Sequence, residues 1–241
     1  MNAWTPYCGP APAPGDWLAL WNLDPVLIGA LLVGLAASWR LAAPSRRSLL
    51  LVAIALIALL FISPLCRLSS ALFSVRAGHH LLLVALVAPL LAHSQPLRRS
   101  GPLTVASAVH LALFWLWHAP QAYDFALSHD AAFWTMQLSL LGSGVWFWTA
   151  LRGASAPAAV AALLGVMVGM GLLGALITFA GAPLYGPHLI TTYAWGMTPL
   201  HDQQLAGLIM WAPGAFAYLA AAVVILGQWM GPSPVLGEPR P

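Results

Sequence analysis

The chain carries several side chains that bind transition metals, in a sequence that is otherwise nearly free of charge. It has eight histidines, seven methionines, two cysteines and six acidic residues among 241. Two adjacent histidines, His79 and His80, open one apolar run. His118 closes another, and Asp202 opens a third. Neutral imidazole is a common metal ligand, and methionine thioether shifts the preference toward Cu(I). These residue types predict metal binding if the fold brings them together.

The composition indicates which solvent surrounds these residues. Hydrophobic residues make up 61% of the chain and charged residues 6%, whereas a soluble domain has about 25% charged residues. The mean hydropathy is +0.84. So few charges cannot cover a water-facing surface, and we therefore expect the lipid bilayer to be the main solvent. The nine basic residues are arginines spread between apolar runs, which excludes the clustered basic patch of a nucleic-acid-binding protein.

Seven apolar segments are long enough to be transmembrane helices, since about 20 residues cross the bilayer core. They are Val26–Leu41, Ser48–Leu65, Ala77–His93, Leu103–His118, Ala131–Leu151, Pro157–Ala180 and Gln203–Trp229. We therefore expect an all-α, polytopic membrane protein with about seven transmembrane helices in residues 26–230. Residues 1–25 form an N-terminal segment and residues 231–241 a tail. The first residues do not read as a cleavable signal peptide, so the first span is expected to direct insertion.

The arginines predict the orientation of this bundle. With the N-terminus outside, the inner side receives Arg40, Arg46, Arg47, Arg98, Arg99, Arg152 and Arg240, and the outer side receives Arg67 and Arg76. Cytoplasmic loops carry an excess of basic residues. The expected topology is N-out and C-in, with a periplasmic N-terminal segment and a cytoplasmic tail.

On this topology most of the ionisable groups fall on the outer side. Six histidines lie there: His79, His80, His118, His129, His188 and His201. Five of the six acids share that side, and His110 lies two turns below His118. Taken singly, an interfacial histidine or a helix-capping aspartate needs no function. Their convergence favours a site, because ionisable groups near membrane spans usually face the bundle interior.

The predicted metal site has a ranked set of ligands. His80, His118 and Asp202 are expected to meet near the outer surface, because three spans place an ionisable group at the same depth. The secondary candidates are His79, His201, Gln203 and Met210. Tyr123 or Asp124 is expected to orient an imidazole. Histidine suits copper or zinc, and methionine shifts the expected metal toward Cu(I).

Two further patterns concern packing and the cysteines. Gly165-x-x-x-Gly169 is typical of close helix–helix contact. Cys8 and Cys66 both fall on the outer side, where an oxidising compartment would allow a disulfide. The sequence leaves two alternatives open, a disulfide or two unrelated thiols.

Several motifs, in order, resemble one family. They are Gly78-His79-His80; Trp117-His118-Ala119-Pro120 followed by Tyr123-Asp124; Thr178-Phe179-Ala180-Gly181-x-Pro183-Leu184-Tyr185; and Asp202-Gln203-Gln204-Leu205-Ala206-Gly207 followed by Met210-Trp211. The chain resembles the multi-span CtaG family of bacterial cytochrome c oxidase assembly proteins, from about the second span to the end of the seventh.

This resemblance implies a role in the maturation of haem–copper oxidase. It implies supply or holding of copper at the outer face of the bacterial inner membrane, with oxidase subunits and periplasmic copper chaperones as partners. The implied functional residues are His80, His118, Asp202, Gln203 and Met210. The chain departs from the family where many members have histidine: Arg76 stands one turn before His80, and Met136 and Gln137 stand in the fifth span. Homo-oligomerisation is left open.

Two alternatives to a non-enzymatic assembly factor remain. One is a copper transporter across the inner membrane, for which His110 and Met170 could be steps along a path. The other is a haem-binding membrane cytochrome with His80 and His118 as axial ligands. An enzyme is least favoured, because no nucleophile–base pair or nucleotide motif stands out.

Overall fold

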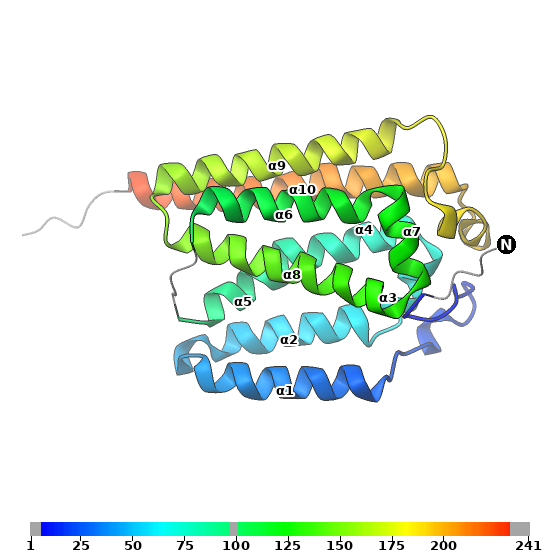
Figure 1. The fold of residues 1–241 in the computed structure, drawn as a ribbon, viewed down its shortest axis with the longest axis horizontal. Helices are drawn as coiled ribbons and strands as arrows, with labels where there is room; N and C mark the ends of the chain where they lie inside the picture. Colours follow the sequence, from blue (N-terminus) through cyan, green and yellow to red (C-terminus); the bar gives the residue numbers. More distant parts are fainter. Residues whose placement is uncertain (1–5, 97–100, 232–241) are drawn as a thin grey trace, which may run out of the picture.

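The computed structural model describes residues 6–96 and 101–231, and within these ranges it contains helices and no strands. The long helices lie side by side and alternate in direction (Figure 1). The α-helices are α1 (Pro25–Leu41), α2 (Arg47–Phe61), α3 (Leu65–Ala71), α4 (Phe73–Leu82), α5 (Ala88–Ser94), α6 (Leu103–His118), α7 (Pro120–Ser128), α8 (Asp130–Arg152), α9 (Ala156–Phe179) and α10 (Pro199–Met230). The predicted all-α fold is confirmed.

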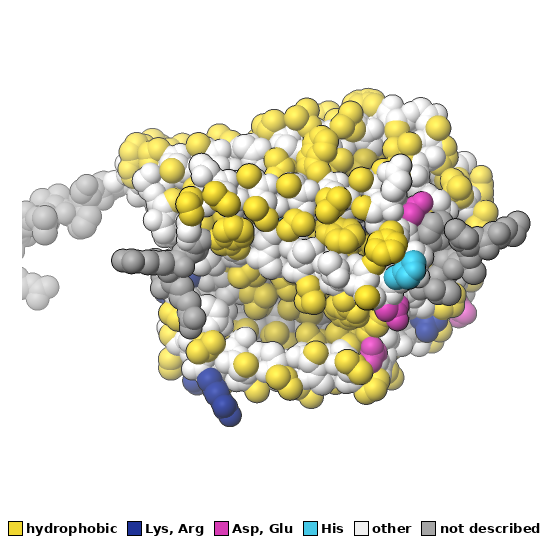
Figure 2. All heavy atoms as spheres, in the orientation of Figure 1, with side chains coloured by type: hydrophobic (Ala, Val, Ile, Leu, Met, Phe, Trp, Pro, Cys, Tyr) yellow, Lys and Arg dark blue, Asp and Glu magenta, His cyan; other side chains and the backbone are white. Residues whose placement is uncertain are grey.

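The exterior of the bundle is apolar, as a membrane protein requires. Large hydrophobic side chains such as Leu32, Val168 and Phe216 are exposed, and apolar side chains cover the middle of the face in Figure 2. Within the described ranges, four helical segments are long and apolar enough to cross a membrane: Pro44–Phe61, Phe73–Ser94, Ala156–Phe179 and Pro199–Met230. A fifth is added if α6 and α7, bent by 73°, form one span.

The structure thus supports four or five candidate spans and does not establish seven. Each of the seven predicted segments is helical over most of its length, but two of them are weak as spans. Helix α1 has 17 residues, about 25 Å at 1.5 Å per residue, which is shorter than the roughly 30 Å hydrocarbon core. Helix α8 begins with Asp130, ends with Arg152 and carries Gln137 in between, which lowers its hydropathy.

The two ends of the bundle differ in their side chains. One end contains residues 6–24, α3, α7 and the α9–α10 connection, and we call it the histidine end (Figure 1). The opposite end contains the α1–α2 turn, the end of α5 and the α8–α9 connection, and we call it the arginine end. The arginine end carries Arg40, Arg46, Arg47 and Arg152. The acidic and histidine side chains visible in Figure 2 gather toward the opposite, histidine end.

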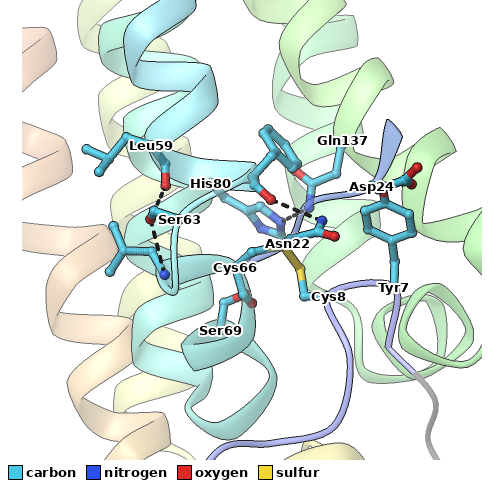
Figure 3. Close-up of a disulfide and its surroundings, with 12 residues drawn as sticks. Tyr7, Cys8, Asn22, Asp24, Leu59, Ser63, Cys66, Ser69, His80 and Gln137 are labelled. Carbon is cyan, nitrogen blue, oxygen red and sulfur yellow. Dashed lines mark hydrogen bonds between the residues drawn. A yellow bond between two sulfur atoms is a disulfide. The ribbon is translucent and has the colours of Figure 1, made fainter. Parts of the chain in front are cut away.

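A disulfide ties the N-terminal segment to the histidine end. Cys8 and Cys66 are bonded, with 2.02 Å between their sulfurs (Figure 3). The Asn22 side-chain amide also donates to the Phe61 carbonyl at 3.1 Å. Of the two alternatives that the sequence left open for the cysteines, the structure selects the disulfide. In the chain-entropy model a bridge between residues 58 apart in the sequence stabilises the fold by about 4 kcal/mol.

A π-helical turn, Leu83–Val87, joins α4 to α5 directly after the two adjacent histidines. Pro89 follows it and cannot donate a backbone hydrogen bond to the preceding turn. The carbonyl of Val84 accepts a hydrogen bond from Trp148 Nε1 at 2.9 Å, so helix α8 satisfies a group in the irregular turn. In lipid such a group must find a partner inside the protein.

Helices α9 and α10 are in backbone contact through two glycines. A Cβ atom on Gly207 would lie 2.2 Å from Thr178 Oγ1 and 2.5 Å from the Gly174 carbonyl oxygen. The predicted Gly165-x-x-x-Gly169 motif does not make this contact. Gly169 meets Leu111 of α6, and Gly165 has no neighbour within 4 Å of its Cβ position. The predicted close helix–helix contact is therefore present at Gly169 and not at Gly165.

Replacing Gly207 by alanine should destabilise the bundle by about 1–3 kcal/mol, the usual effect of overpacking. The new methyl group would overlap with Thr178 and with the backbone of Gly174. Thermal unfolding of purified protein in detergent would measure the loss. Gly142→Ala is the matched control, since a Cβ there meets nothing within 4 Å. Equal unfolding temperatures for Gly207→Ala and the native protein would contradict the close contact.

Candidate functional site

The structure brings His80 of α4 and His118 of α6 into direct contact. His80 Nδ1 lies 3.4 Å from His118 Nε2, and both rings are buried. His118 is the last residue of α6, so its ring reaches the histidine end, where α4 begins. The Tyr185 hydroxyl donates to the His118 carbonyl at 2.8 Å. This bond ties the α9–α10 connection to the end of α6.

The partners of the two rings imply a consistent arrangement of protons. The Phe114 carbonyl can only accept, so the 2.7 Å contact requires a proton on His118 Nδ1. Nε2 of His118 then presents a lone pair, and His80 Nδ1–H donates to it. Nε2 of His80 accepts from the Gln137 side-chain amide at 3.3 Å. In this arrangement both imidazoles are neutral, which is the form that binds metals.

Gln137 gives the pair a second arrangement. Its Oε1 is buried and makes no hydrogen bond among the described residues. If the amide oxygen and nitrogen exchange places, Oε1 accepts from His80 Nε2–H, and His80 Nδ1 loses its proton. Two nitrogen lone pairs then face each other. Gln137 borders an apolar cavity of about 400 Å³, which leaves its amide room to rotate.

Asp202 does not join the histidine pair. Its carboxylate accepts hydrogen bonds from the backbone N–H groups of Phe73 at 2.6 Å and Ser74 at 3.1 Å, and from the Ser74 hydroxyl. These residues are the first two of α4, where N–H groups have no partner within the helix. Asp202 of α10 therefore caps α4. The prediction that all three residues converge was wrong for Asp202, because a helix N-terminus at the same depth binds its carboxylate.

The secondary candidates do not join the pair, although the His79 ring centroid lies 5.9 Å from that of His80. His79 packs edge-on against Phe61, with ring centroids 4.7 Å apart. His201 is exposed in the first turn of α10. Gln203 binds backbone groups in the last turn of α9 and just after it: its Oε1 accepts from Leu184 N at 2.7 Å, and its Nε2 donates to the Ile177 and Ala182 carbonyls. Met210 packs at the Gly174 contact between α9 and α10. Within residues 6–96 and 101–231, no group of three or more His, Cys, Asp or Glu side chains could hold a metal ion.

Tyr123 orients a different imidazole from the one expected. Its hydroxyl lies 2.7 Å from His188 Nε2, and His188 Nδ1 lies 3.3 Å from the Ala71 carbonyl. Burial lowers the pKa of His188 to about 3, so this ring is neutral. His188 therefore links α7 to α3 and acts as a structural residue. Asp124 is the other residue expected in this role, and its Oδ1 makes no hydrogen bond within the described part of the chain.

Sequence reasoning placed the two histidines correctly in depth but did not include Gln137 among the ligating or orienting residues. The available signal was its position, since it stands where many members of the resembling family have a histidine. Two residues lie close to the site without belonging to the pair, Arg76 and His79, and both are buried.

Replacing Asp202 by alanine should lower stability by about 2–3 kcal/mol, because buried N–H groups at the start of α4 lose their acceptor. Hydrogen exchange should accelerate at Phe73 and Ser74. Asp130→Ala is the matched control, since Asp130 is also in a first helical turn but is exposed. A stable Asp202→Ala protein that has lost bound metal would instead make Asp202 a ligand.

Comparison with known proteins agrees with the family resemblance. The family described as cytochrome c oxidase caa3 assembly factor (Caa3_CtaG) matches residues 93–231. This range contains His118, Gln137 and Asp202, and it begins after His80. No curated protein and no solved structure matches the chain. The matched range covers more than half of the 241 residues, and the chain therefore belongs to the family of cytochrome c oxidase caa3 assembly factors.

Proposed function

We propose that the protein is a non-enzymatic assembly factor that holds copper between His80 and His118 for delivery to haem–copper cytochrome c oxidase. The observation that carries this proposal is the facing pair of neutral imidazoles, 3.4 Å apart between nitrogens. Two nitrogen ligands of a tetrahedral metal with bonds of about 2.0–2.1 Å are about 3.3–3.4 Å apart. The pair therefore has the spacing of two metal ligands.

In this proposal the protein holds copper temporarily and passes it to the oxidase. A site with few protein ligands suits such temporary binding. Closed structural metal sites have four protein ligands, whereas here two imidazoles are supported by one amide. Metal binding requires the lone pair of His80 Nδ1, which the exchanged amide of Gln137 supplies. Gln137 is thus a positioning residue that selects the tautomer of His80.

We further propose that the protein is a multi-pass protein of the bacterial inner membrane, with about seven spans and the histidine end in the periplasm. The arginine end carries four described arginines, against Arg67 and Arg76 at the histidine end, which agrees with the positive-inside rule. The disulfide at the histidine end favours an oxidising compartment for that side. Oxidase subunits and periplasmic copper chaperones would meet the protein there.

The two alternative functions have less support. A haem between His80 and His118 would need space for its macrocycle, and the two rings are in direct contact. A transport path would pass His110, which is bound to Ser143 at 3.0 Å and to Tyr218 at 3.4 Å. This residue has partners on both ring nitrogens, so it serves to join α6, α8 and α10.

His118→Ala should abolish stoichiometric copper binding and impair oxidase maturation, because it removes one of two ligands. Elemental analysis of purified protein and oxidase activity in complemented cells are the measurements. His129→Ala, an exposed histidine of the same end, should bind copper normally. Gln137→Leu should weaken binding without removing a ligand. Full copper content in a folded His80→Ala/His118→Ala protein would exclude the site.

The proposed topology has its own test. A reporter that is active only in the periplasm should be active in the Gly181–Asp202 connection and inactive after Pro241, since the arginine excess keeps the C-terminal side in the cytoplasm. A reporter that is active only in the cytoplasm should give the reverse pattern. Periplasmic activity after Pro241 would overturn the orientation.

A further inference from the structure

We propose that Arg76 and His79 bind a small inorganic anion, such as chloride, inside the histidine end. Arg76 is fully buried, and none of its three guanidinium nitrogens makes a hydrogen bond within the described part of the chain. His79 lies one turn later on α4, is 3% exposed, and has two ring nitrogens without a partner. Residues three apart on a helix are neighbours.

Both side chains face one aromatic wall between α2 and α8. The Arg76 guanidinium carbon lies 5.3 Å from the Phe133 ring centroid. The His79 ring packs edge-on against Phe61, which in turn stacks on Trp134 at 5.5 Å. An aromatic face attracts a cation but cannot accept five guanidinium N–H donors. The donors of Arg76 are therefore left unused beside this wall.

No carboxylate of the described chain neutralises Arg76. The carboxylate of Asp202 contacts the same helix, but it is already bound to the first turn of α4. The Tyr123 hydroxyl lies near Arg76 but makes no hydrogen bond to it, and it is neutral and bound to His188. An arginine cannot lose its proton in a protein, and a buried charge without a partner strongly destabilises the fold. A counterion is the remaining way to neutralise it.

The zero exposure of Arg76 determines the size of that counterion. A phospholipid headgroup or an organic acid would require a large opening beside the guanidinium. A halide fits between a guanidinium and an imidazole, because both can donate to it. The required tautomer of His79 carries a proton on the nitrogen nearest to Arg76. This proposal does not rest on copper binding, since neither Arg76 nor His79 belongs to the His80–His118 pair.

The first measurement is thermal unfolding of the metal-free, full-length protein in chloride and in gluconate at equal ionic strength. The native protein should show a saturable rise in unfolding temperature with chloride. Arg76→Met, which keeps the side-chain length without the charge, should lose this dependence. Arg67→Met, at the partly exposed arginine of the same end, should retain it. An unfolding temperature that is independent of the anion in the native protein would oppose the proposal.

The second measurement keeps the proposal testable if Arg76→Met does not fold. Crystals of the native protein grown in bromide should show one anomalous peak in contact with the Arg76 guanidinium and the His79 ring. Water density without an anomalous peak at this position would overturn the proposal. A folded Arg76→Met protein whose unfolding temperature still rises with chloride as in the native protein would do so as well, because the anion would then bind without the guanidinium.

Discussion

The carboxylate of Asp202 at the N-terminus of α4 is the interaction on which the histidine end depends. Helix α4 follows α3 after an extended residue, Leu72, and no side chain of its own caps it. Asp202 satisfies its first N–H groups from α10. This bond fixes where α4 begins and so fixes the depth and direction of the residues one and two turns later. Those residues include Arg76, His79 and His80.

The hydrogen bonds around His80 depend on how α6, α8 and the π-helical turn pack around it. Helix α6 ends at His118, whose ring is held by the Phe114 carbonyl one turn earlier. Helix α8 places Gln137 on the opposite side of His80. Gly144 of α8 lets this helix approach both α5 and the π-helical turn closely, since a Cβ there would lie 3.0 Å from the Ala88 Cβ and 3.7 Å from the Val84 Cα. A chain of hydrogen bonds thus runs from Gln137 through the His80 and His118 rings to the Phe114 carbonyl, and it connects α8, α4 and α6.

The sequence predicts the position of a residue along the bundle axis better than it predicts which neighbouring helix its side chain faces. The apolar runs predicted the helices, because bilayer thickness sets the length of a span. The arginines between these runs predicted the end of the bundle at which each polar group lies. They could not tell which helix faces which. Asp202 binds the N-terminus of α4, about two turns before His80, whereas the His80 imidazole binds another imidazole. The same limit explains why Gln203 and Met210 were expected at the site but serve the α9–α10 side of the bundle. It also explains why Gly174 and Gly207, which are distant in sequence, could not be paired in advance.

The charge of Arg76 limits what the histidine pair can hold. Arg76 and His80 are four residues apart on α4 and therefore lie on one face of the helix. Repulsion between a metal ion and the guanidinium scales with the product of their charges. A divalent ion at the pair would meet twice the repulsion of a monovalent one at the same distance, so the arrangement favours Cu(I) over Cu(II) as the cargo we propose. An anion beside Arg76 would offset this repulsion. Occupancy of the anion site and affinity for copper would then be coupled, although each rests on its own contacts.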